Sequence, residues 1–114
     1  MPKLPNVTLR HVGMYVIDMD RMVGFYEGVL GFTVADRGPF RDGEIAFMTR
    51  DPDEHHEIVF MTGRAPDSPT TVNQVSFRAD SFADVRATHD LLVAARMEKI
   101  DPVDHGNALS VYFW

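Results

Sequence analysis

Apolar and polar residues alternate over residues 7–18. Val12, Met14 and Val16 fall on one face of an extended chain, and His11 falls on the opposite face. Side chains point alternately to the two faces of a strand, so this alternation predicts a strand that lies half in the core. On such a strand His11 points away from the apolar side chains.

A helical period follows this strand. Apolar residues recur at spacings of three and four positions, as one buried face of a helix requires. Asp18 or Asp20 is placed to cap the start of the helix, and Gly31 is placed to stop it. The pattern predicts an amphipathic helix of about three turns, with an apolar face formed by Met22, Phe25, Tyr26, Val29 and Leu30.

Three more segments complete the first half of the chain. Residues 32–35 and 44–49 are rich in β-forming residues, and the glycines, proline and aspartate between them predict a hairpin. After a polar interruption at residues 50–54, residues 55–62 predict another strand. The predicted order is therefore β-α-β-β-β.

The pattern starts again after residues 63–70, which hold two prolines, a glycine and a serine and are predicted to be a linker. Residues 72–79 alternate like a strand, and Ser81 with Asp84 resembles a capping box at the start of a helix. Beyond this helix the sequence predicts a short strand, a loop and a strong strand, at residues 98–100, 102–106 and 108–114.

An internal repeat accounts for this order. At an offset of 63, residues 11–16 align with residues 74–79, and a helix follows each segment. We expect an α+β fold of two β-α-β-β-β modules, at about 7–62 and 71–114, in a single domain over residues 1–114. The second module lacks a last strand, and an apolar end at Trp114 is unusual for a natural terminus, so we expect a truncated chain.

Composition and charge narrow the function. With 45% hydrophobic and 25% charged residues among 114, the chain is expected to be globular. Its net charge of −6 disfavours nucleic acid and anionic membranes, so the expected partner is a small molecule. The sequence contains no cysteine, which leaves histidine, carboxylate and amide oxygen to bind any metal. Neither a signal peptide nor a membrane span is evident, and a cytoplasmic protein is expected.

Four segments together resemble the glyoxalase/bleomycin-resistance/extradiol-dioxygenase family, also called the vicinal oxygen chelate superfamily. They are LRHV at residues 9–12, FYEGVLGF at 25–32, HHEIV at 55–59, and HGNA at 105–108 with the later pair Tyr112 and Phe113. The resemblance covers nearly the whole chain and implies a curved mixed sheet around a cup-shaped site. The closing segment looks most like the extradiol ring-cleavage branch.

The resemblance implies a set of metal ligands in this cup. His11 and His56 are the first two, with Glu57 as the alternative to His56, because the pleat lets only one of two neighbours face the cup. Gln74 takes the repeat-equivalent place of His11, where extradiol enzymes carry a histidine, and an amide oxygen is a weaker ligand than imidazole. The glutamate that the family carries after the position of Tyr112 is absent from the chain. For each residue the alternative is a structural polar side chain.

His105 and Tyr112 resemble residues that move protons and hydrogen-bond substrate oxygens in ring-cleaving members, a task that suits imidazole near neutral pH. The favoured hypothesis is therefore a metal-dependent, extradiol-type dioxygenase for a small catechol-like aromatic substrate, using iron(II) or else manganese(II). Gln74 and the missing glutamate favour the alternative, a metal-free ligand-binding or resistance protein of the same fold. A glyoxalase-type lyase or isomerase is a third reading.

The missing strand also bears on metal binding and on assembly. A site without its glutamate leaves open that the chain as given binds no metal. A module without its last strand exposes a sheet edge, and exposed edges pair with other chains. We therefore expect a homodimer.

Overall fold

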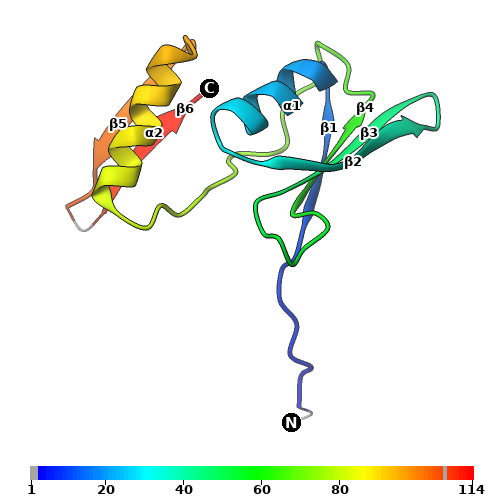
Figure 1. Cartoon of the computed structure of the whole chain (residues 1–114), viewed down its shortest axis with the longest axis horizontal. Coiled ribbons are helices and arrows are strands. Elements are labelled where there is room, and N and C mark those ends of the chain that lie inside the picture. Colours follow the sequence, from blue (N-terminus) through cyan, green and yellow to red (C-terminus); the bar gives the residue numbers. More distant parts are fainter. Residues whose placement is uncertain (1–2, 107) are drawn as a thin grey trace. The chain divides into compact units, whose positions relative to one another are not determined.

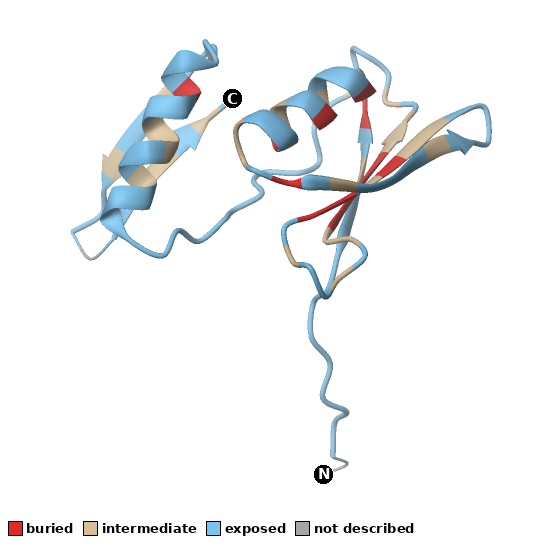
Figure 2. Ribbon diagram, in the orientation of Figure 1, coloured by how far each residue is buried: buried red, intermediate tan, exposed pale blue. Residues whose placement is uncertain are grey.

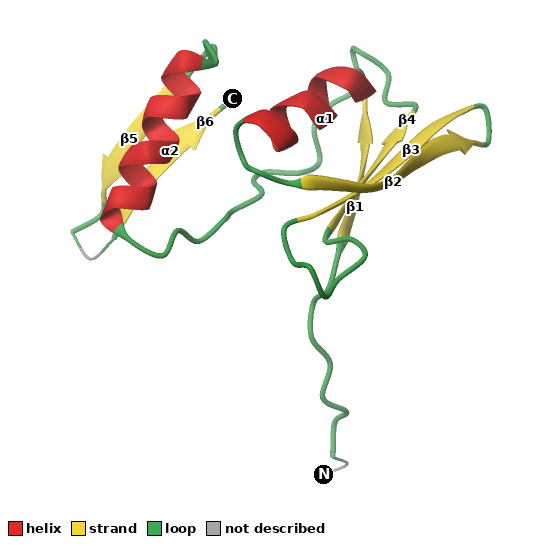
Figure 3. Ribbon diagram, viewed as in Figure 1, coloured by secondary structure: helices red, strands yellow, loops and turns green. Residues whose placement is uncertain are grey.

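The computed structural model describes residues 3–106 and 108–114, which fall into two compact units, Met1–Ser68 and Pro69–Trp114. The expected α+β class is confirmed, with two helices and two separate sheets in the described residues (Figures 1 and 3). No helix in this part of the chain is long and apolar enough to cross a membrane. In chain order the elements are β1 (Val12–Val16), α1 (Met19–Gly28), β2 (Thr33–Phe40), β3 (Gly43–Thr49), β4 (Ile58–Thr62), α2 (Phe82–Ala94), β5 (Ile100–Asp104) and β6 (Leu109–Phe113).

The first unit has the predicted β-α-β-β-β order. Its four strands form one mixed sheet in the order β1-β4-β3-β2. β1 runs parallel to β4, and the pairs β2–β3 and β3–β4 are antiparallel. The first and last strands of the unit are therefore neighbours. Because they are parallel, their N-terminal ends lie at the same end of the sheet.

The core of the first unit lies between α1 and the sheet. The Tyr26 ring of α1 packs edge-on against Phe60 of β4 at a centroid distance of 4.9 Å, and against Phe32 at 5.3 Å. Each large side chain buried in this way contributes about 1.5–3 kcal/mol relative to an exposed one. Figure 2 shows the buried positions in red, and the core cluster consists of Val16, Met19, Val23, Tyr26, Phe32, Ala46, Met48, Ile58 and Phe60.

Asp18 and Asp20, the two candidate caps of the first helix, have different roles. Asp18 is the N-cap, and its Oδ1 accepts a hydrogen bond from the backbone N–H of Arg21 at 3.1 Å. Asp20 instead forms an ion pair with Arg37 on β2. The cap therefore starts the helix, whereas Asp20 ties the first helical turn to the sheet.

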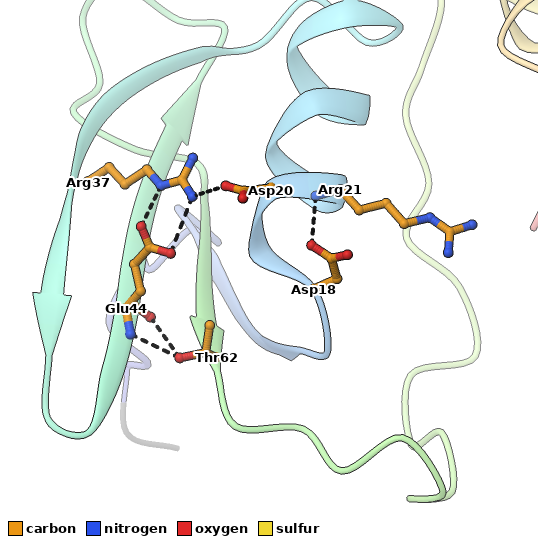
Figure 4. A network of polar contacts seen from close by, with 6 residues as sticks. All are labelled: Asp18, Asp20, Arg21, Arg37, Glu44 and Thr62. Atoms are coloured by element: carbon orange, nitrogen blue, oxygen red, sulfur yellow. Dashed lines mark hydrogen bonds and ion pairs between the residues drawn. The ribbon is translucent and has the colours of Figure 1, made fainter.

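Arg37 connects three elements of the first unit (Figure 4). Its Nε donates to Glu44 Oε2 on β3 at 2.7 Å, and its Nη2 donates to both Glu44 and Asp20. These bonds, first of all the one to Glu44, raise the pKa of Arg37. The backbone N–H of Glu44 in turn donates to Thr62 Oγ1 of β4 at 2.9 Å. The start of β3 is thus fixed to both of its neighbours and to α1.

The hairpin and the fourth strand differ in their bounds from the prediction. β2 continues through Gly38 and Pro39, which were predicted to lie in a turn. Proline is tolerated there because β2 is an edge strand of the sheet. β4 begins only at Ile58, since the preceding residues form a loop that is held by side-chain hydrogen bonds.

The second unit consists of α2 and an antiparallel hairpin of β5 and β6. Ser81 caps α2 as predicted, since its Oγ accepts from the backbone N–H of Asp84 at 3.1 Å. The short strand expected at residues 98–100 is instead β5, which includes Pro102 and most of the predicted loop. Leu92 is the only buried residue in the part of this unit that the structure describes.

The prediction of a strand at residues 72–79 is wrong. This segment has no regular secondary structure, and all of its residues are exposed. In the first unit the corresponding strand, β1, is paired only with β4, at the end of the sheet. No described strand of the second unit takes the place of β4, so the alternating segment has no ladder to join.

Candidate metal and substrate site

Two of the predicted ligands, His11 and His56, are brought together by the parallel pairing of β1 and β4. Val12 is in register with Ile58, and the backbone N–H of Val12 donates to the carbonyl of Glu57 at 3.0 Å. His11 comes directly before β1, and His56 lies two residues before β4. Their ring centroids are 4.4 Å apart. The two imidazoles therefore form a pair at the end of the first unit's sheet where β1 and β4 begin.

Neighbouring contacts hold this pair in place. Arg10 Nη1 forms a salt bridge with Glu54 Oε1 at 2.8 Å, which ties the residue before His11 to the loop before His56. The Phe47 ring on β3 packs against the His56 ring at a centroid distance of 5.0 Å. His56 therefore rests on an aromatic side chain of the sheet.

His55 joins the same cluster, a contact that the sequence reasoning missed. Its Nδ1 lies 2.9 Å from Nδ1 of His56, so one of these nitrogens donates a proton and the other accepts it. It also packs against Phe47 at a centroid distance of 5.3 Å. The available signal is the His-His dipeptide, but the sequence predicts a strand at this place, and adjacent side chains of a strand point to opposite faces.

The environment favours neutral imidazole at His56. Burial lowers the pKa of His56, and the nearby His11 and His55 rings lower it further, while Glu54 opposes them. Neutral imidazole is the form of histidine that binds metal ions. His56 therefore keeps its metal-binding form down to a lower pH than a free histidine does.

Glu57, the alternative to His56, is engaged elsewhere. Its Oε1 accepts from the backbone N–H of Arg50 at 2.8 Å and from the Thr49 hydroxyl at 3.3 Å. These bonds close the loop between β3 and β4. The geometry thus puts the side chain of His56, rather than that of Glu57, against His11.

In the second unit, His105 and Tyr112 lie together. The Tyr112 hydroxyl is 3.3 Å from Nε2 of His105. The backbone N–H of His105 donates to the carbonyl of Ala108 at 2.9 Å and so closes the β5–β6 hairpin. Gly106, with a φ of 84°, forms the tip of that turn, and Asn107 of the same segment lies outside the described residues. The two residues with predicted proton-transfer roles are therefore hydrogen-bonded neighbours.

Gln74 is exposed in the irregular segment at residues 72–79. Among the described residues, no three or more histidine, cysteine, aspartate or glutamate side chains are grouped so as to hold a metal ion. The structure thus supplies two imidazoles at one place in the first unit, and a histidine–tyrosine pair in the second.

The chain matches known proteins by family and by fold. Residues 8–113 match the family model described as the Glyoxalase/Bleomycin resistance protein/Dioxygenase superfamily. A search of curated proteins finds no match. Among solved structures, a variant of the fosfomycin resistance protein FosX from Listeria monocytogenes, complexed with Mn(II) and a dihydroxypropylphosphonic acid, has a TM-score of 0.75 at 16% identity. The match covers 96% of this chain and 85% of that one.

Two further structures are similar. The trypanothione-dependent glyoxalase I of Leishmania major has a TM-score of 0.67 at 18% identity, covering 95% of this chain and 80% of that one. FosX from Mesorhizobium loti has a TM-score of 0.67 at 18% identity, covering 98% and 84%. The fold places the chain in the class of proteins built on the β-α-β-β-β module, which the first unit contains. The chain belongs to the glyoxalase/bleomycin resistance/dioxygenase superfamily, the vicinal oxygen chelate proteins.

Proposed function

We propose that the chain is a metal-dependent enzyme that acts on a small substrate with two adjacent oxygen atoms. The observation that carries this proposal is the His11–His56 pair, with ring centroids 4.4 Å apart. Two imidazoles at one place suit a divalent transition metal, because imidazole is a good ligand for iron, copper, zinc and nickel alike. A structural role alone does not require two histidines to meet at a sheet edge.

The residues present fit part of a coordination shell. His11 and His56 would each supply one ring nitrogen, and Gln74 is the remaining ligand expected from the family resemblance. A divalent ion bound there would act as a Lewis acid and as a template for two substrate oxygens. Iron(II), and after it manganese(II), is the metal we propose.

The proton chemistry falls to His105 and Tyr112. The Tyr112 hydroxyl and Nε2 of His105 are 3.3 Å apart, within reach of proton exchange as geometry tightens around a substrate. An imidazole can accept a proton from a catechol hydroxyl and return it later, while the tyrosine hydroxyl donates to a substrate oxygen. We therefore propose a catechol-like aromatic substrate that is cleaved with dioxygen.

Metal binding by histidine variants tests the first half of this proposal. The wild-type chain is expected to bind one iron(II) or manganese(II) per chain in anaerobic titration calorimetry. His11→Ala or His56→Ala should weaken binding by more than about 100-fold, because even loss of an outer partner of a ligand costs about 10- to 100-fold. His89→Ala, which removes a histidine paired with Asp90 on α2, is the matched control and should bind as wild type does.

Oxygen uptake with catechols tests the second half. His105→Gln should abolish uptake while it leaves the metal stoichiometry unchanged, since it removes a proton carrier and no ligand. A chain that binds metal tightly but consumes no oxygen with any catechol would contradict the ring-cleavage reaction and leave the metal site standing. Absence of metal binding in the wild-type chain would contradict both halves.

A second candidate is a metal-free protein of the same fold that binds a small ligand. The observation in its favour is that the carboxylate of Glu57 is held by Thr49 and Arg50, away from the histidine pair. Unchanged thermal stability on addition of every divalent metal, together with stabilisation by an aromatic ligand, would identify this alternative.

A further inference from the structure

His55 contacts His56 directly, yet the proposed metal site gives it no role. We propose that His55 is a positioning residue for His56. Its Nδ1 accepts the proton of His56 Nδ1–H, and this bond leaves Nε2 of His56 as the nitrogen that binds metal. The role in metal binding rests on the proposed function, whereas the state of the His56 ring in the metal-free chain can be measured without it.

The two rings meet through one nitrogen each. Nδ1 of His55 lies 2.9 Å from Nδ1 of His56, an ordinary hydrogen-bond distance. The rings are almost perpendicular, at 89°, with centroids 5.1 Å apart. A neutral imidazole has one nitrogen that donates and one that accepts. Of the two Nδ1 atoms, one therefore carries a proton and the other does not, so the two rings are in opposite tautomers.

The other contact of His56 indicates which ring donates. His56 also packs against His11, the second proposed ligand, at a centroid distance of 4.4 Å. Imidazole binds a metal through an unprotonated nitrogen. If His56 accepted at Nδ1, its proton would be on Nε2, and neither nitrogen would be free. If His56 donates from Nδ1, Nε2 is unprotonated and free, and the exposed His55 ring can donate its own Nε2–H to water.

The backbone on both sides of the His-His dipeptide is held in place. The N–H of Glu54 donates to the carbonyl of Asp51 at 3.1 Å, and the N–H of Glu57 donates to the carbonyl of Met48 at 2.8 Å. The dipeptide lies before β4 begins, in a segment without regular secondary structure. The strand rule that adjacent side chains point to opposite faces does not apply there, and the two rings can meet.

Phe47 of β3 supports both rings. Its centroid lies 5.3 Å from that of His55, at an interplanar angle of 55°, and 5.0 Å from that of His56, at 61°. Any flat ring at position 55 would preserve this packing, but only a hydrogen-bond acceptor there would preserve the contact with Nδ1 of His56. Packing and hydrogen bonding by His55 can therefore be separated by substitution.

His55 is a neighbour of a ligand and not a third ligand. In the part of the chain that the structure describes, no three side chains of the metal-binding types are grouped so as to hold one ion. The second nitrogen of a metal-binding histidine usually donates to a partner that fixes the tautomer and orientation of the ring. The geometry gives His55 this place beside His56.

Nitrogen-15 NMR of the metal-free, full-length chain tests the tautomer. At about pH 8.5, above the ordinary pKa of histidine, His56 of the wild type should be protonated at Nδ1. His55→Asn should keep this state, because an amide oxygen accepts the same bond. His55→Phe should lose the preference, since it keeps a ring on Phe47 but has no acceptor. Protonation of His56 at Nε2 in the wild type would overturn the proposal.

The same two variants separate positioning from packing. If His55 acted only by packing on Phe47, His55→Phe would behave as the wild type does and His55→Asn would not. That reversed pattern would also overturn the proposal. His55 is exposed, so we expect both variants to remain folded, which circular dichroism checks.

Manganese(II) titration of the three chains tests the role in metal binding. His55→Phe should weaken binding by about 10- to 100-fold, as loss of the partner of a ligand does, and His55→Asn should remain close to the wild type. Equal affinity of His55→Phe and the wild type would overturn the positioning role and leave the proposed function standing. Absence of binding to the wild type would instead contradict the proposed function, and the tautomer of His56 would still decide whether His55 orients the ring.

Discussion

At the scale of single residues, the cluster around His56 makes the stability of the first unit depend on pH. Partial burial, and after it the two other imidazoles of His11 and His55, lower the pKa of His56 from its ordinary value of 6.5. Protonation of this ring is thus less favourable in the folded chain than in the unfolded one. The lowered pKa favours the neutral form of His56 beside the other two rings.

The sign of the pH effect follows. The unfolded chain binds a proton at His56 near pH 6.5, whereas the folded chain binds it only at lower pH. The contribution to folding is therefore fully present above about pH 6.5 and is lost as the pH falls through the lowered pKa. In metal-free urea unfolding, wild type should lose more free energy of unfolding between pH 7.5 and pH 5 than His56→Gln does.

His89→Gln serves as the control for this experiment. It removes a histidine that pairs with Asp90 on α2 and lies outside the cluster. Its pH dependence should remain close to that of wild type in this interval. Equal pH dependence of wild type and His56→Gln would show that the cluster carries no proton linkage.

At the scale of elements, the local sequence predicted the features that depend only on residues close together in the chain. The cap at Ser81 and the alternation of β1 are local properties, and both are found in the structure. Residues 72–79 alternate in the same way and form no strand. Alternation shows that a segment can form a strand, but a strand also needs a neighbour, and that depends on residues far away in the chain.

The bounds of β5 also depend on pairing, since residues that the sequence predicts as loop form part of this strand. The sequence predicts a loop at Pro102 and Asp104, yet both residues lie in the strand. Their place there follows from the ladder, because the proline nitrogen sits at a position that does not donate to β6. The sequence alone does not reveal which nitrogens face outward.

Pro102 protects the outer edge of β5, because proline has no N–H to donate there, and this leads to a prediction about assembly. Pro102→Val restores an outward N–H at the centre of this edge and adds a residue that favours strands. With an outward N–H on this edge, the hairpin should pair with other copies of the chain and form larger species that light scattering detects. Ile100→Val, on the same strand, adds no donor and should leave the assembly state unchanged. Unaltered assembly of Pro102→Val would show that the proline does not protect the edge.

At the scale of the whole molecule, the two units differ in how much core they contain. The first unit buries a cluster around Phe60, whereas the second buries Leu92 alone among its described residues. The first unit was predictable because its apolar residues recur at regular spacings. The family was predictable from the four segments that resemble it. The site was predictable only in part, since the order of residues gives the histidines but not the orientation of Glu57 or the contact with His55.

This difference predicts separate responses to cavities in the two cores. Phe60→Ala should destabilise the first unit by about 3–5 kcal/mol, and Leu92→Ala should destabilise the second by about 2–5 kcal/mol. Followed by amide exchange, each variant should speed exchange mainly in its own unit. Uniform acceleration across both units by either variant would show that they unfold as one cooperative body.

The parallel pairing of β1 with β4 also sets when the histidine pair can form. Val12 and Ile58 are in register although the whole of α1, β2 and β3 separates them along the chain. Contacts between residues so distant in sequence close late in folding, because the entropy of a long loop must first be overcome. During synthesis on a ribosome, His11 therefore cannot contact His56 until β4 has emerged. The meeting of His11 and His56 thus reports that the first unit is complete, and an incomplete nascent chain lacks the pair.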